Sequence, residues 1–500
     1  MTAIPRATGL TATETDTEEL ELLIEAADTA TSHWAALPTS DRAEILRSIA
    51  HRIDTAADEL IALAREETQL AEGRLRGEIN RTTFQLRLFA DMLADGGYLD
   101  ARVDHANNDW PMGPRPDIRR VLEPLGPVLV FAASNFPFAF SIAGGDTCSA
   151  LAAGCPVIVK AHPGHPKLSS ATGRIVAEGL AASGAPEGVF SVIFGTQAAR
   201  NALTDPRIKA GAFTGSIPGG RALFDLAVSR PEPIPFYGEL GSVNPVFVTK
   251  AAATARGQQI AREFISAYTL GAGQFCTKPG ILFIPDDSAI IAVLQTTEQN
   301  PAAPLLNDRI QQGYIQAARQ LFNHPAVEPI VQSHGSYTDP PAPSLATTTI
   351  QALLSDPENL TTECFGPTAL VVRYHDEHEL LQAARLLPGQ LTATIHGDDT
   401  DTLAPELVRL LARKAGRILW NEWPTGVSVT YAQQHGGPYP ATTAPTTTSV
   451  GTASISRFLR PVAYQGLPDN LLPTPLQNAN PLHIPRQIDG SLPFRDSIPS

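Results

Sequence analysis

The sequence has few of the features that would place it in a membrane, outside the cell or on a structural metal. Only four of its 500 residues are cysteines, which excludes a disulfide scaffold, and it has no C-x-x-C pair or Cys/His zinc spacing. No run approaches the roughly 18 apolar residues that a membrane helix needs. Residues 1–20 lack the basic and apolar regions of a signal peptide. These absences predict a cytoplasmic protein with reduced thiols, no membrane partner and no metal.

Positive charge is also scarce. The chain has 37 Lys and Arg residues against 51 Asp and Glu residues, a formal net charge of −14. This balance argues against a nucleic acid as a partner, although a local basic pocket for an anionic ligand is compatible with it. The remaining composition, with 43% hydrophobic and 18% charged residues, is typical of a soluble globular protein. Its length predicts about two to four domains.

The order of apolar and polar residues predicts an α/β fold. Residues 1–100 are expected to form helices, the first capped by Asp16 and the last stopped by Gly96-Gly97. Beyond Val121, short apolar runs alternate with stretches of helical spacing, which is typical of βαβ units and a parallel sheet. A second α/β stretch is predicted from Glu239 to about Val429. The predicted strands are 128–131, 157–159, 189–194, 210–213, 281–284 and 369–372, and the helices between them are 142–153, 167–183, 219–229 and 255–270.

Cys276 is the candidate nucleophile. It lies in Gly271-Ala-Gly-Gln-Phe-Cys-Thr-Lys-Pro-Gly280, where small residues surround one thiol just after a predicted helix. A thiolate is a strong nucleophile, and a neighbouring backbone N–H can stabilise the oxyanion that its attack creates. The segment alone is about equally compatible with a buried structural cysteine, which is the interpretation that we favour for Cys148, Cys155 and Cys364.

Two polar side chains are predicted at the ends of strands, where ligand sites of parallel sheets lie. Glu239 stands between apolar residues and glycines, which makes it a candidate for a raised pKa and for general-base work. Asn135 follows the strand 128–131 and can donate its side-chain amide to an oxyanion. Taken singly, each has a simpler explanation, because most glutamates are solvated and an asparagine before Phe-Pro is more often a turn residue.

Three further segments have residue types that suit a nucleotide. Lys160 follows the strand 157–159. The loop Phe213-Thr-Gly-Ser-Ile-Pro-Gly-Gly220 joins a strand to a helix, where free N–H groups can hold a phosphate. This loop is not G-x-G-x-x-G and is a weak pattern alone, as is Glu363-Cys-Phe-Gly-Pro367.

In combination these segments are specific. A strand-end asparagine, a strand-end lysine, a Gly-Ser loop, Glu-Leu-Gly, Gly-Gln-Phe-Cys and Glu-x-Phe-Gly-Pro occur in this order, and six ordered motifs make chance a poor explanation. From about Arg42 to the C-terminus the chain resembles the aldehyde dehydrogenase superfamily. A narrower resemblance is to its 2-oxoglutarate semialdehyde (2,5-dioxopentanoate) dehydrogenase branch, and related NADP-dependent fatty aldehyde dehydrogenases share some of the features. The branch resemblance is carried by 134–137, 143–146, 160–163, 239–245, 424–427, 435–442, 448–451 and 457–461.

The family resemblance implies a domain arrangement. We expect a Rossmann-type cofactor domain from 1–100 and 121–238, and an α/β catalytic domain from 239–428. Residues 101–120 and 429–500 are expected to supply a small β oligomerisation element with a C-terminal extension, and the partner would be a second copy in a homodimer or homotetramer. The oligomerisation element would contain a strand pair before Val121 and a strand within about 429–467.

The resemblance also implies a role for each candidate residue. Cys276 would attack the aldehyde carbon, and the Asn135 amide and the Cys276 backbone N–H would hold the oxyanion. After hydride transfer to the nicotinamide, Glu239 would activate water to hydrolyse the thioester. The implied cofactor contacts are Lys160 and Glu363 at ribose hydroxyls, Gly215 and Ser216 near the pyrophosphate with Gly220 in the same loop, and Phe365 beside the nicotinamide ribose.

Two departures from similar proteins bear on specificity. Pro163 stands three residues after the lysine, where NAD-preferring relatives have a glutamate on the adenine ribose. Without that carboxylate a 2′-phosphate meets no repulsion, so we predict that NADP⁺ is preferred, with NAD⁺ left open as a second cofactor. Gln433-Gln434 replaces more apolar residues, which favours a small oxo-acid over a long alkyl chain if the stretch lines the substrate tunnel. The sequence does not identify a cation for the substrate carboxylate.

Three other functions are compatible with parts of the pattern. An acylating, CoA-dependent aldehyde dehydrogenase would use the same cysteine and dispense with Glu239. A cysteine hydrolase needs a histidine partner for Cys276, and His435 is the only histidine in a glycine-rich context. A non-catalytic scaffold of the same fold predicts loss of Cys276, Glu239 or Asn135, yet all three are present.

Overall fold

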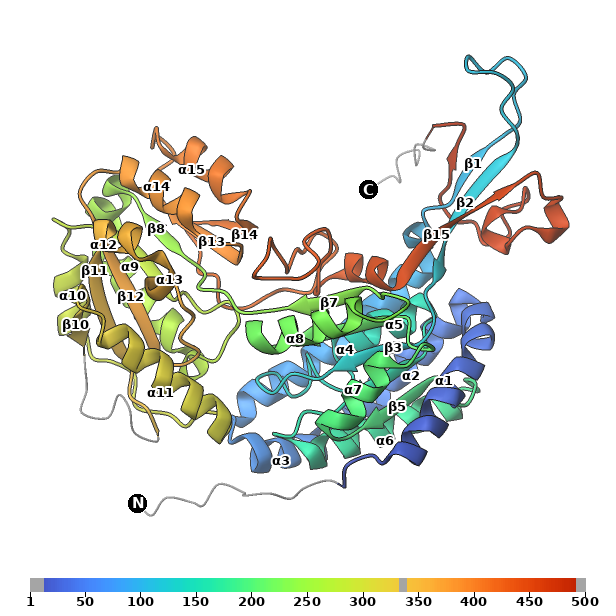
Figure 1. The fold of residues 1–500 in the computed structure, drawn as a ribbon, viewed down its shortest axis with the longest axis horizontal. Helices are drawn as coiled ribbons and strands as arrows, with labels where there is room; N and C mark the ends of the chain where they lie inside the picture. Colours follow the sequence, from blue (N-terminus) through green and yellow to red (C-terminus); the bar gives the residue numbers. More distant parts are fainter. Residues whose placement is uncertain (1–12, 332–339, 492–500) are drawn as a thin grey trace.

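Three sheets organise the chain in the computed structural model, which describes residues 13–331 and 340–491 (Figure 1). A five-stranded sheet lies in what we call the first lobe and a seven-stranded sheet in the second lobe. A four-stranded sheet forms an arm that projects from the first lobe. The predictions for residues 1–12 and for the last nine residues of the C-terminal extension fall outside the described residues. Within the described ranges, no helix is long and apolar enough to cross a membrane.

The five-stranded sheet confirms the predicted βαβ units. All its strands run parallel in the order β5-β4-β3-β6-β7, and every residue of β3 is buried, as its uninterrupted apolar sequence predicts. Helices lie between the strands in sequence and cover both faces of the sheet. The elements are β3 (Val128–Phe131), α5 (Gly145–Ala153), β4 (Val157–Lys160), α6 (Pro166–Ala182), β5 (Phe190–Ile193), α7 (Thr196–Thr204), β6 (Ala210–Thr214), α8 (Ile217–Val228) and β7 (Phe236–Glu239).

The predicted N-terminal helices are present and belong to the first lobe. Asp16 caps the first of them by accepting a hydrogen bond from the backbone N–H of Glu19, and Gly96 ends the last in a left-handed conformation with φ 69°. The first helix packs on one face of the sheet with α7, and the others pack on the opposite face with α5 and α6. These helices are α1 (Thr17–Ala36), α2 (Thr39–Thr55), α3 (Ala57–Thr68) and α4 (Glu72–Asp95).

The second lobe is a second α/β layer with its own buried clusters. Its strands run in the order β10-β11-β12-β9-β8-β13-β14, and all neighbours pair in parallel except the edge strand β10. Its elements are β8 (Val246–Val248), α9 (Lys250–Thr269), η2 (Leu270–Gly273), β9 (Ile281–Pro285), α10 (Ile290–Thr296), α11 (Asp308–Phe322), β10 (Glu328–Val331), β11 (Ser344–Thr349), α12 (Ile350–Ser355), α13 (Pro357–Leu360), β12 (Thr368–Tyr374), α14 (His378–Leu386), β13 (Gln390–His396), α15 (Ala404–Leu411) and β14 (Ala415–Trp420).

The arm joins strands from distant parts of the chain. Its order is β15-β2-β1-β16, from β1 (Arg102–Asp104), β2 (Ile118–Pro124), β15 (Leu459–Gln465) and β16 (Gln487–Ile488). The strand pair and the C-terminal strand were expected, but the boundary at Val121 falls inside β2, where Val121 pairs with Val462. Residues 429–458 do not enter this sheet, and Thr442 instead forms a bridge with Glu239. The division into domains stays a prediction. The strand pairing favours moving the predicted boundary at Val121 and the one at Val429.

A buried ion pair fixes the chain just before β15. Arg457, in the short helix η3 (Thr452–Phe458), contacts Asp146 of α5 at 2.5 Å between Nη2 and Oδ1. Both side chains are almost fully buried, so each charge depends on the other for compensation. The contact brings two segments of the branch resemblance together and anchors the C-terminal part of the chain to the first lobe.

Candidate active site

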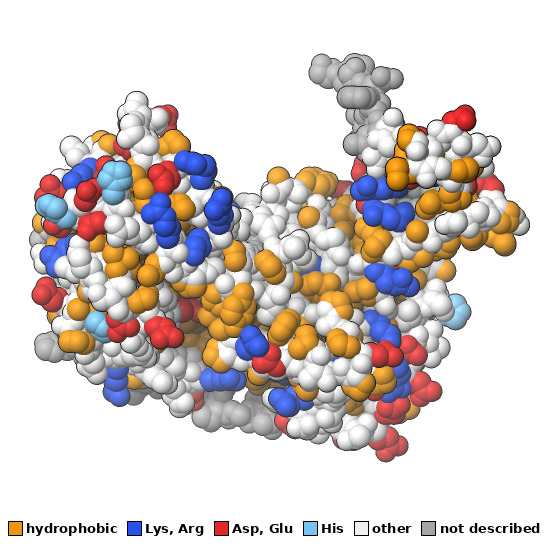
Figure 2. Space-filling view, turned by 45° about the horizontal axis from the view of Figure 1, so that its top comes forward, with side chains coloured by type: hydrophobic (Ala, Val, Ile, Leu, Met, Phe, Trp, Pro, Cys, Tyr) orange, Lys and Arg blue, Asp and Glu red, His pale blue; other side chains and the backbone are white. Residues whose placement is uncertain are grey.

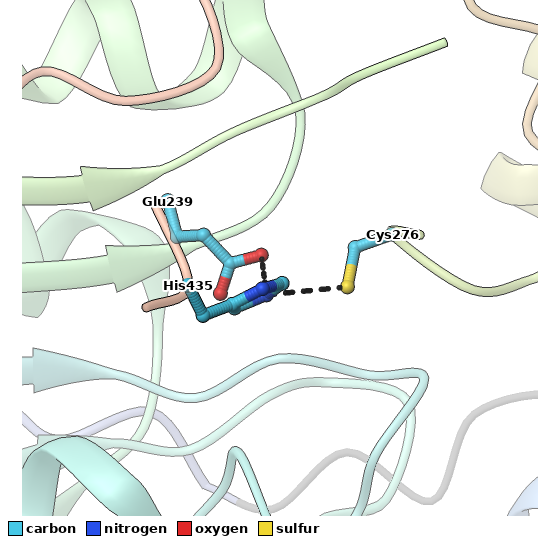
Figure 3. A group of neighbouring side chains, drawn as sticks. All are labelled: Glu239, Cys276 and His435. Carbon is cyan, nitrogen blue, oxygen red and sulfur yellow. Dashed lines mark hydrogen bonds and ion pairs between the residues drawn. The ribbon is translucent and has the colours of Figure 1, made fainter. Parts of the chain in front are cut away.

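Three reactive side chains meet between the two lobes (Figure 3). Glu239 is the last residue of β7, Cys276 follows η2, and His435 lies in the loop between β14 and η3. The Cys276 Sγ is 3.6 Å from His435 Nε2, and the same Nε2 is 2.9 Å from Glu239 Oε1. A thiol, an imidazole and a carboxylate within such distances can exchange a proton directly.

Glu239 is buried, yet its charge is compensated. Its side chain is 3% exposed, and Oε2 accepts a hydrogen bond of 3.1 Å from the Ser449 hydroxyl. Burial raises the pKa of Glu239, but the charge and contact of His435 and the Ser449 hydroxyl outweigh burial and lower it below the ordinary value. The prediction of a raised pKa was therefore wrong. The groups that lower the pKa are His435 and Ser449, which belong to a distant loop and are not sequence neighbours of Glu239.

The Cys276 thiol is held in its neutral form. Burial raises its pKa well above the usual value, and the negative charge of Glu239 raises it further. The other three cysteines are also free thiols, and burial raises the pKa of both Cys155 and Cys364 to about 11. Cys276 differs from the other three in having an imidazole against its sulfur, and His435 can accept the proton when the thiolate forms.

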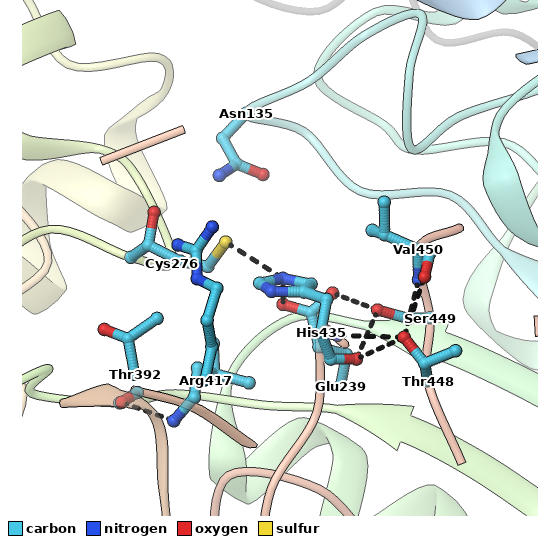
Figure 4. A network of polar contacts seen from close by, with 12 residues as sticks. Asn135, Glu239, Cys276, Thr392, Arg417, His435, Thr448, Ser449 and Val450 are labelled. Atoms are coloured by element: carbon cyan, nitrogen blue, oxygen red, sulfur yellow. Dashed lines mark hydrogen bonds and ion pairs between the residues drawn. The ribbon is translucent and has the colours of Figure 1, made fainter. Parts of the chain in front are cut away.

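The loop that carries His435 is fixed by its own hydrogen bonds (Figure 4). The His435 backbone N–H donates to Thr448 Oγ1 at 2.8 Å, and the Ser449 N–H donates to the His435 carbonyl at 2.8 Å. The Ser449 hydroxyl sits 3.2 Å from the same carbonyl and also reaches Glu239. The sequence analysis considered His435 only as a hydrolase partner and missed Ser449, although both lie in segments that carry the branch resemblance.

Asn135 reaches the cysteine loop from the first lobe. Its Nδ2 donates to the Gln274 carbonyl at 3.1 Å, and its side chain points toward the thiol in Figure 4. The Asn135 carbonyl accepts a hydrogen bond from Arg74 of α4. The structure therefore brings Asn135, Cys276 and Glu239 together, as the sequence predicted from three separated motifs.

The backbone around Cys276 is shaped by a left-handed turn. Gly271, Ala272 and Gly273 all have positive φ, and a Cβ at Gly273 would lie 2.1 Å from the Gly366 carbonyl oxygen. The glycine of Gly-Gln-Phe-Cys thus lets the nucleophile loop pack against the Glu363–Pro367 segment. The buried Lys278 ammonium ties the two segments together by donating to the carbonyls of Cys364, Gly366 and Thr368.

Lys160, Gly215 and Ser216 have a geometry that fits a nucleotide. Lys160 ends β4, and Gly215 and Ser216 are exposed at the start of the twelve-residue helix α8, where Ser216 accepts from the Gly219 N–H at 3.3 Å. The loop is held to β7 because the Gly215 N–H donates to the Glu239 carbonyl at 3.0 Å. Gly220 differs, because it is buried and a Cβ there would lie 2.1 Å from Leu240 Cδ2, which gives it a packing function.

Glu363 and Phe365 are half-buried in the segment that packs on the cysteine loop. A Cβ at Gly241 would lie 2.1 Å from Glu363 Oε2, so the glycine of Glu-Leu-Gly makes room for this carboxylate. Burial raises the pKa of Glu363 to about 7, against the lowering effect of the Lys278 charge. The cofactor contacts that the sequence predicted for these residues stay predictions.

Geometry alone leaves more than one chemistry open. The histidine contact that a cysteine hydrolase requires is present at 3.6 Å, and the cysteine, histidine and glutamate are also ligand types for a zinc ion, although the sequence predicted no metal. A model of the aldehyde dehydrogenase family matches residues 5–439. The chain belongs to the aldehyde dehydrogenase family. It is therefore an NAD(P)-dependent oxidoreductase, and the α/β fold predicted from the resemblance is confirmed.

Relatives agree on the family and narrow the branch. The chain is 46% identical over 480 residues to alpha-ketoglutaric semialdehyde dehydrogenase 2 of Azospirillum brasilense, covering 94% of this chain and 91% of that protein. It is 42% identical to alpha-ketoglutaric semialdehyde dehydrogenase of Acinetobacter baylyi, covering 97% and 93%. Among solved structures it resembles succinic semialdehyde dehydrogenase from Streptococcus pyogenes in complex with NADP⁺, with a TM-score of 0.74, 16% identity and 91% and 96% coverage. At 16% identity this structural similarity supports the fold of this aldehyde dehydrogenase, but not its substrate or cofactor preference.

Proposed function

We propose that this aldehyde dehydrogenase oxidises 2-oxoglutarate semialdehyde to 2-oxoglutarate. Two relatives at 46% and 42% identity carry the name of this activity and are matched over more than nine-tenths of their length. The observation that carries the proposal is the buried contact of Cys276 with His435 and Glu239, because His435 lies in a segment that typifies this branch.

The chain's own residues supply a route for the proton and for the acyl group. The Cys276 thiol gives its proton to His435 Nε2 as sulfur adds to the aldehyde carbon, and the imidazolium then faces Glu239 Oε1 at 2.9 Å. The Asn135 amide and the Cys276 backbone N–H are placed to hold the oxyanion. A bound nicotinamide would supply the hydride acceptor for the thiohemiacetal carbon, and Cys276 would then carry the acyl group as a thioester.

Glu239 is suited to release that thioester. The lowered pKa keeps its carboxylate ionised at neutral pH, so it can accept a proton from water. The water oxygen adds to the thioester carbon, the sulfur departs, and the oxo-acid is the product. This use of Glu239 distinguishes the proposal from an acylating enzyme, in which CoA replaces water and acyl-CoA is the product.

The substrate proposal is tested by comparing three aldehydes. Reduction of NADP⁺ is followed with 2-oxoglutarate semialdehyde, hexanal and dodecanal, and kcat/KM is expected to be at least about 10-fold higher for the semialdehyde. A preference for dodecanal would move the protein to the fatty aldehyde dehydrogenases and leave its mechanism intact. Formation of acyl-CoA in place of free acid would contradict the role of Glu239.

We propose that NADP⁺ is preferred over NAD⁺. Pro163 is exposed beside the end of β4 and brings no carboxylate to that position. Burial lowers the pKa of Lys160, and the positive charge of Arg309 on α11 lowers it further, so two cations lie near one another where a 2′-phosphate is expected. A phosphate dianion between two cations gains Coulomb energy that a ribose hydroxyl does not.

Substituting Pro163 is expected to reverse this selectivity. Pro163→Glu places a negative charge beside the expected 2′-phosphate, which should lower the ratio of NADP⁺ to NAD⁺ affinity by at least about 10-fold. Dissociation constants of both nucleotides are measured by calorimetry without substrate. Pro163→Gln is the control for the loss of the proline ring and should shift the ratio far less. Equal ratios in the wild type and in Pro163→Glu would contradict the assignment.

We also propose a homodimer or homotetramer in the cytoplasm. The arm exposes large hydrophobic side chains, among them Met112 at 91% and Leu471 at 64%, which is typical of a surface that a second copy covers. Figure 2 shows hydrophobic side chains gathered on the arm and along the hollow beside it. Sedimentation velocity is expected to give a species of at least twice the chain mass, and a monomer at micromolar concentration would contradict the oligomer.

A further inference from the structure

One helix of the first lobe presents charged side chains to the reaction site. Arg74, Glu78 and Arg81 are spaced along α4 so that they share one face of the helix. The buried Glu78 accepts hydrogen bonds from the backbone N–H groups of Phe138 and Ala139 at 2.8 and 3.0 Å. These bonds fix α4, and with it the arginines on either side of Glu78, against the segment that follows Asn135.

Two arginines near Cys276 donate hydrogen bonds to backbone carbonyls of the protein. Arg74 donates to the Asn135 carbonyl, and its guanidinium lies about equally close to the rings of Phe136 and Phe275, at 5.1 and 4.9 Å. Arg417, on β14, lies beside Cys276 in Figure 4. Its guanidinium donates to the carbonyls of Pro424 and Gly426 at 2.7 and 3.1 Å, which fixes it as part of the wall.

Arg81, on the same face of α4 as Arg74, has no backbone carbonyl as an acceptor in the described ranges. Its guanidinium lies 5.1 Å from the centre of the Phe140 ring, which is itself 6.5 Å from the His435 ring. In the described ranges it makes no hydrogen bond and no ion pair, although it is half-buried. The nearby charges that act on it are those of Glu78, Cys276 and Glu239, so it belongs to the electrostatic surroundings of the reacting atoms. None of its guanidinium nitrogens is a buried atom without a partner, so its five N–H donors are accessible to solvent and to a ligand.

We propose that Arg81 binds the carboxylate of the substrate, at the end of the molecule opposite the aldehyde. This inference rests on the proposed function, because it supplies the cation that an oxo-acid semialdehyde requires. A guanidinium matches a carboxylate with two parallel hydrogen bonds, which fixes the orientation of the substrate as well as its position. Glu78 and Glu239 would repel an anionic aldehyde, and Arg81 offsets that repulsion. The glutamines of the Gln433-Gln434 pair donate instead to the backbone carbonyls of Ser428 and Thr447, so recognition of the substrate is assigned to the arginine.

The substitution Arg81→Met tests the inference through selectivity. The ratio of kcat/KM for 2-oxoglutarate semialdehyde to kcat/KM for hexanal should fall by about 100-fold, because only the charged substrate loses the hydrogen bonds. The loss should appear mainly in KM, and Arg81→Lys should recover part of it. Arg76→Met is the matched control, since Arg76 is an exposed residue of the same helix that pairs with Asp58 and Glu72. It should leave the ratio unchanged.

Binding of the product provides a second readout that does not depend on turnover. The inhibition constant of 2-oxoglutarate should rise by at least about 10-fold in Arg81→Met, while the melting temperature stays near that of Arg76→Met. An unchanged ratio and an unchanged inhibition constant would overturn the inference. A larger effect of Arg74→Met or Arg417→Met than of Arg81→Met would overturn it as well. A wild-type preference for hexanal would instead contradict the proposed function, so the two failures are distinguishable.

Discussion

Replacing Cys276 by alanine is expected to lower aldehyde oxidation by roughly 10⁴-fold or more, since removing a nucleophile that acts with its base abolishes the covalent route. Its sulfur lies 3.6 Å from His435 Nε2, an imidazole nitrogen that can accept the thiol proton. The residual rate would come from binding and oxyanion stabilisation alone. Turnover is measured as NADPH formation with the semialdehyde at saturating cofactor.

The control for this change is Cys364→Ala. Cys364 is buried in the segment that packs against the cysteine loop, and burial raises the pKa of its thiol to about 11. We expect Cys364→Ala to keep turnover within about 10-fold of the wild type, because its sulfur does not take part in the chemistry. Substantial turnover in Cys276→Ala, or equal losses in the two variants, would contradict the assignment of the nucleophile.

Substituting Glu239 by glutamine should separate the two halves of the reaction. Acylation still proceeds through Cys276 and His435, so one equivalent of NADPH per site is expected in a rapid first phase. Hydrolysis then lacks its base, and steady-state turnover should fall by about 10²–10³-fold, within the range for general-base catalysis. Glu358→Gln, an exposed glutamate of α13, is the control and should show neither the burst nor the loss.

The same substitution should make the thiol more reactive. The charge of Glu239 adds to burial in raising the pKa of Cys276, so removing that charge lowers the pKa and increases the thiolate fraction at any fixed pH. The inactivation rate with iodoacetamide should therefore rise in Glu239→Gln, and its pH profile should move to lower pH. A profile displaced to higher pH would contradict the electrostatic description of the site, whatever the effect on turnover.

The sequence predicted the strands that are short and mainly apolar, whereas polar strands of the second lobe such as β11 and β13 were not predicted. The run 128–131 has no polar residue and forms β3, and small residues and glycines mark the helices and loops around it. The resemblance to aldehyde dehydrogenases also implied that Asn135, Glu239 and Cys276 share one site. Those inferences needed only local periodicity and the ordered motifs.

What the sequence did not predict depends on contacts between distant segments. His435 lies 159 positions from Cys276, in a loop without regular periodicity, and only the folded chain brings its ring to the sulfur. For the same reason the direction of the Glu239 pKa was wrong, because the compensating groups His435 and Ser449 belong to that loop. The position of Val121 inside β2 was likewise hidden, since β2 is defined by pairing with β15, more than three hundred residues later.

The most direct test of the central claim is to trap the acyl group on the enzyme. Glu239→Gln is mixed with 2-oxoglutarate semialdehyde and NADP⁺, quenched in acid after the burst, and its peptides are analysed by mass spectrometry. The account predicts a 2-oxoglutaryl thioester on Cys276 in near-stoichiometric yield, and none in the double variant that also has Cys276→Ala. An acyl group on another residue, or an unmodified Cys276 after a full burst of NADPH, would contradict it.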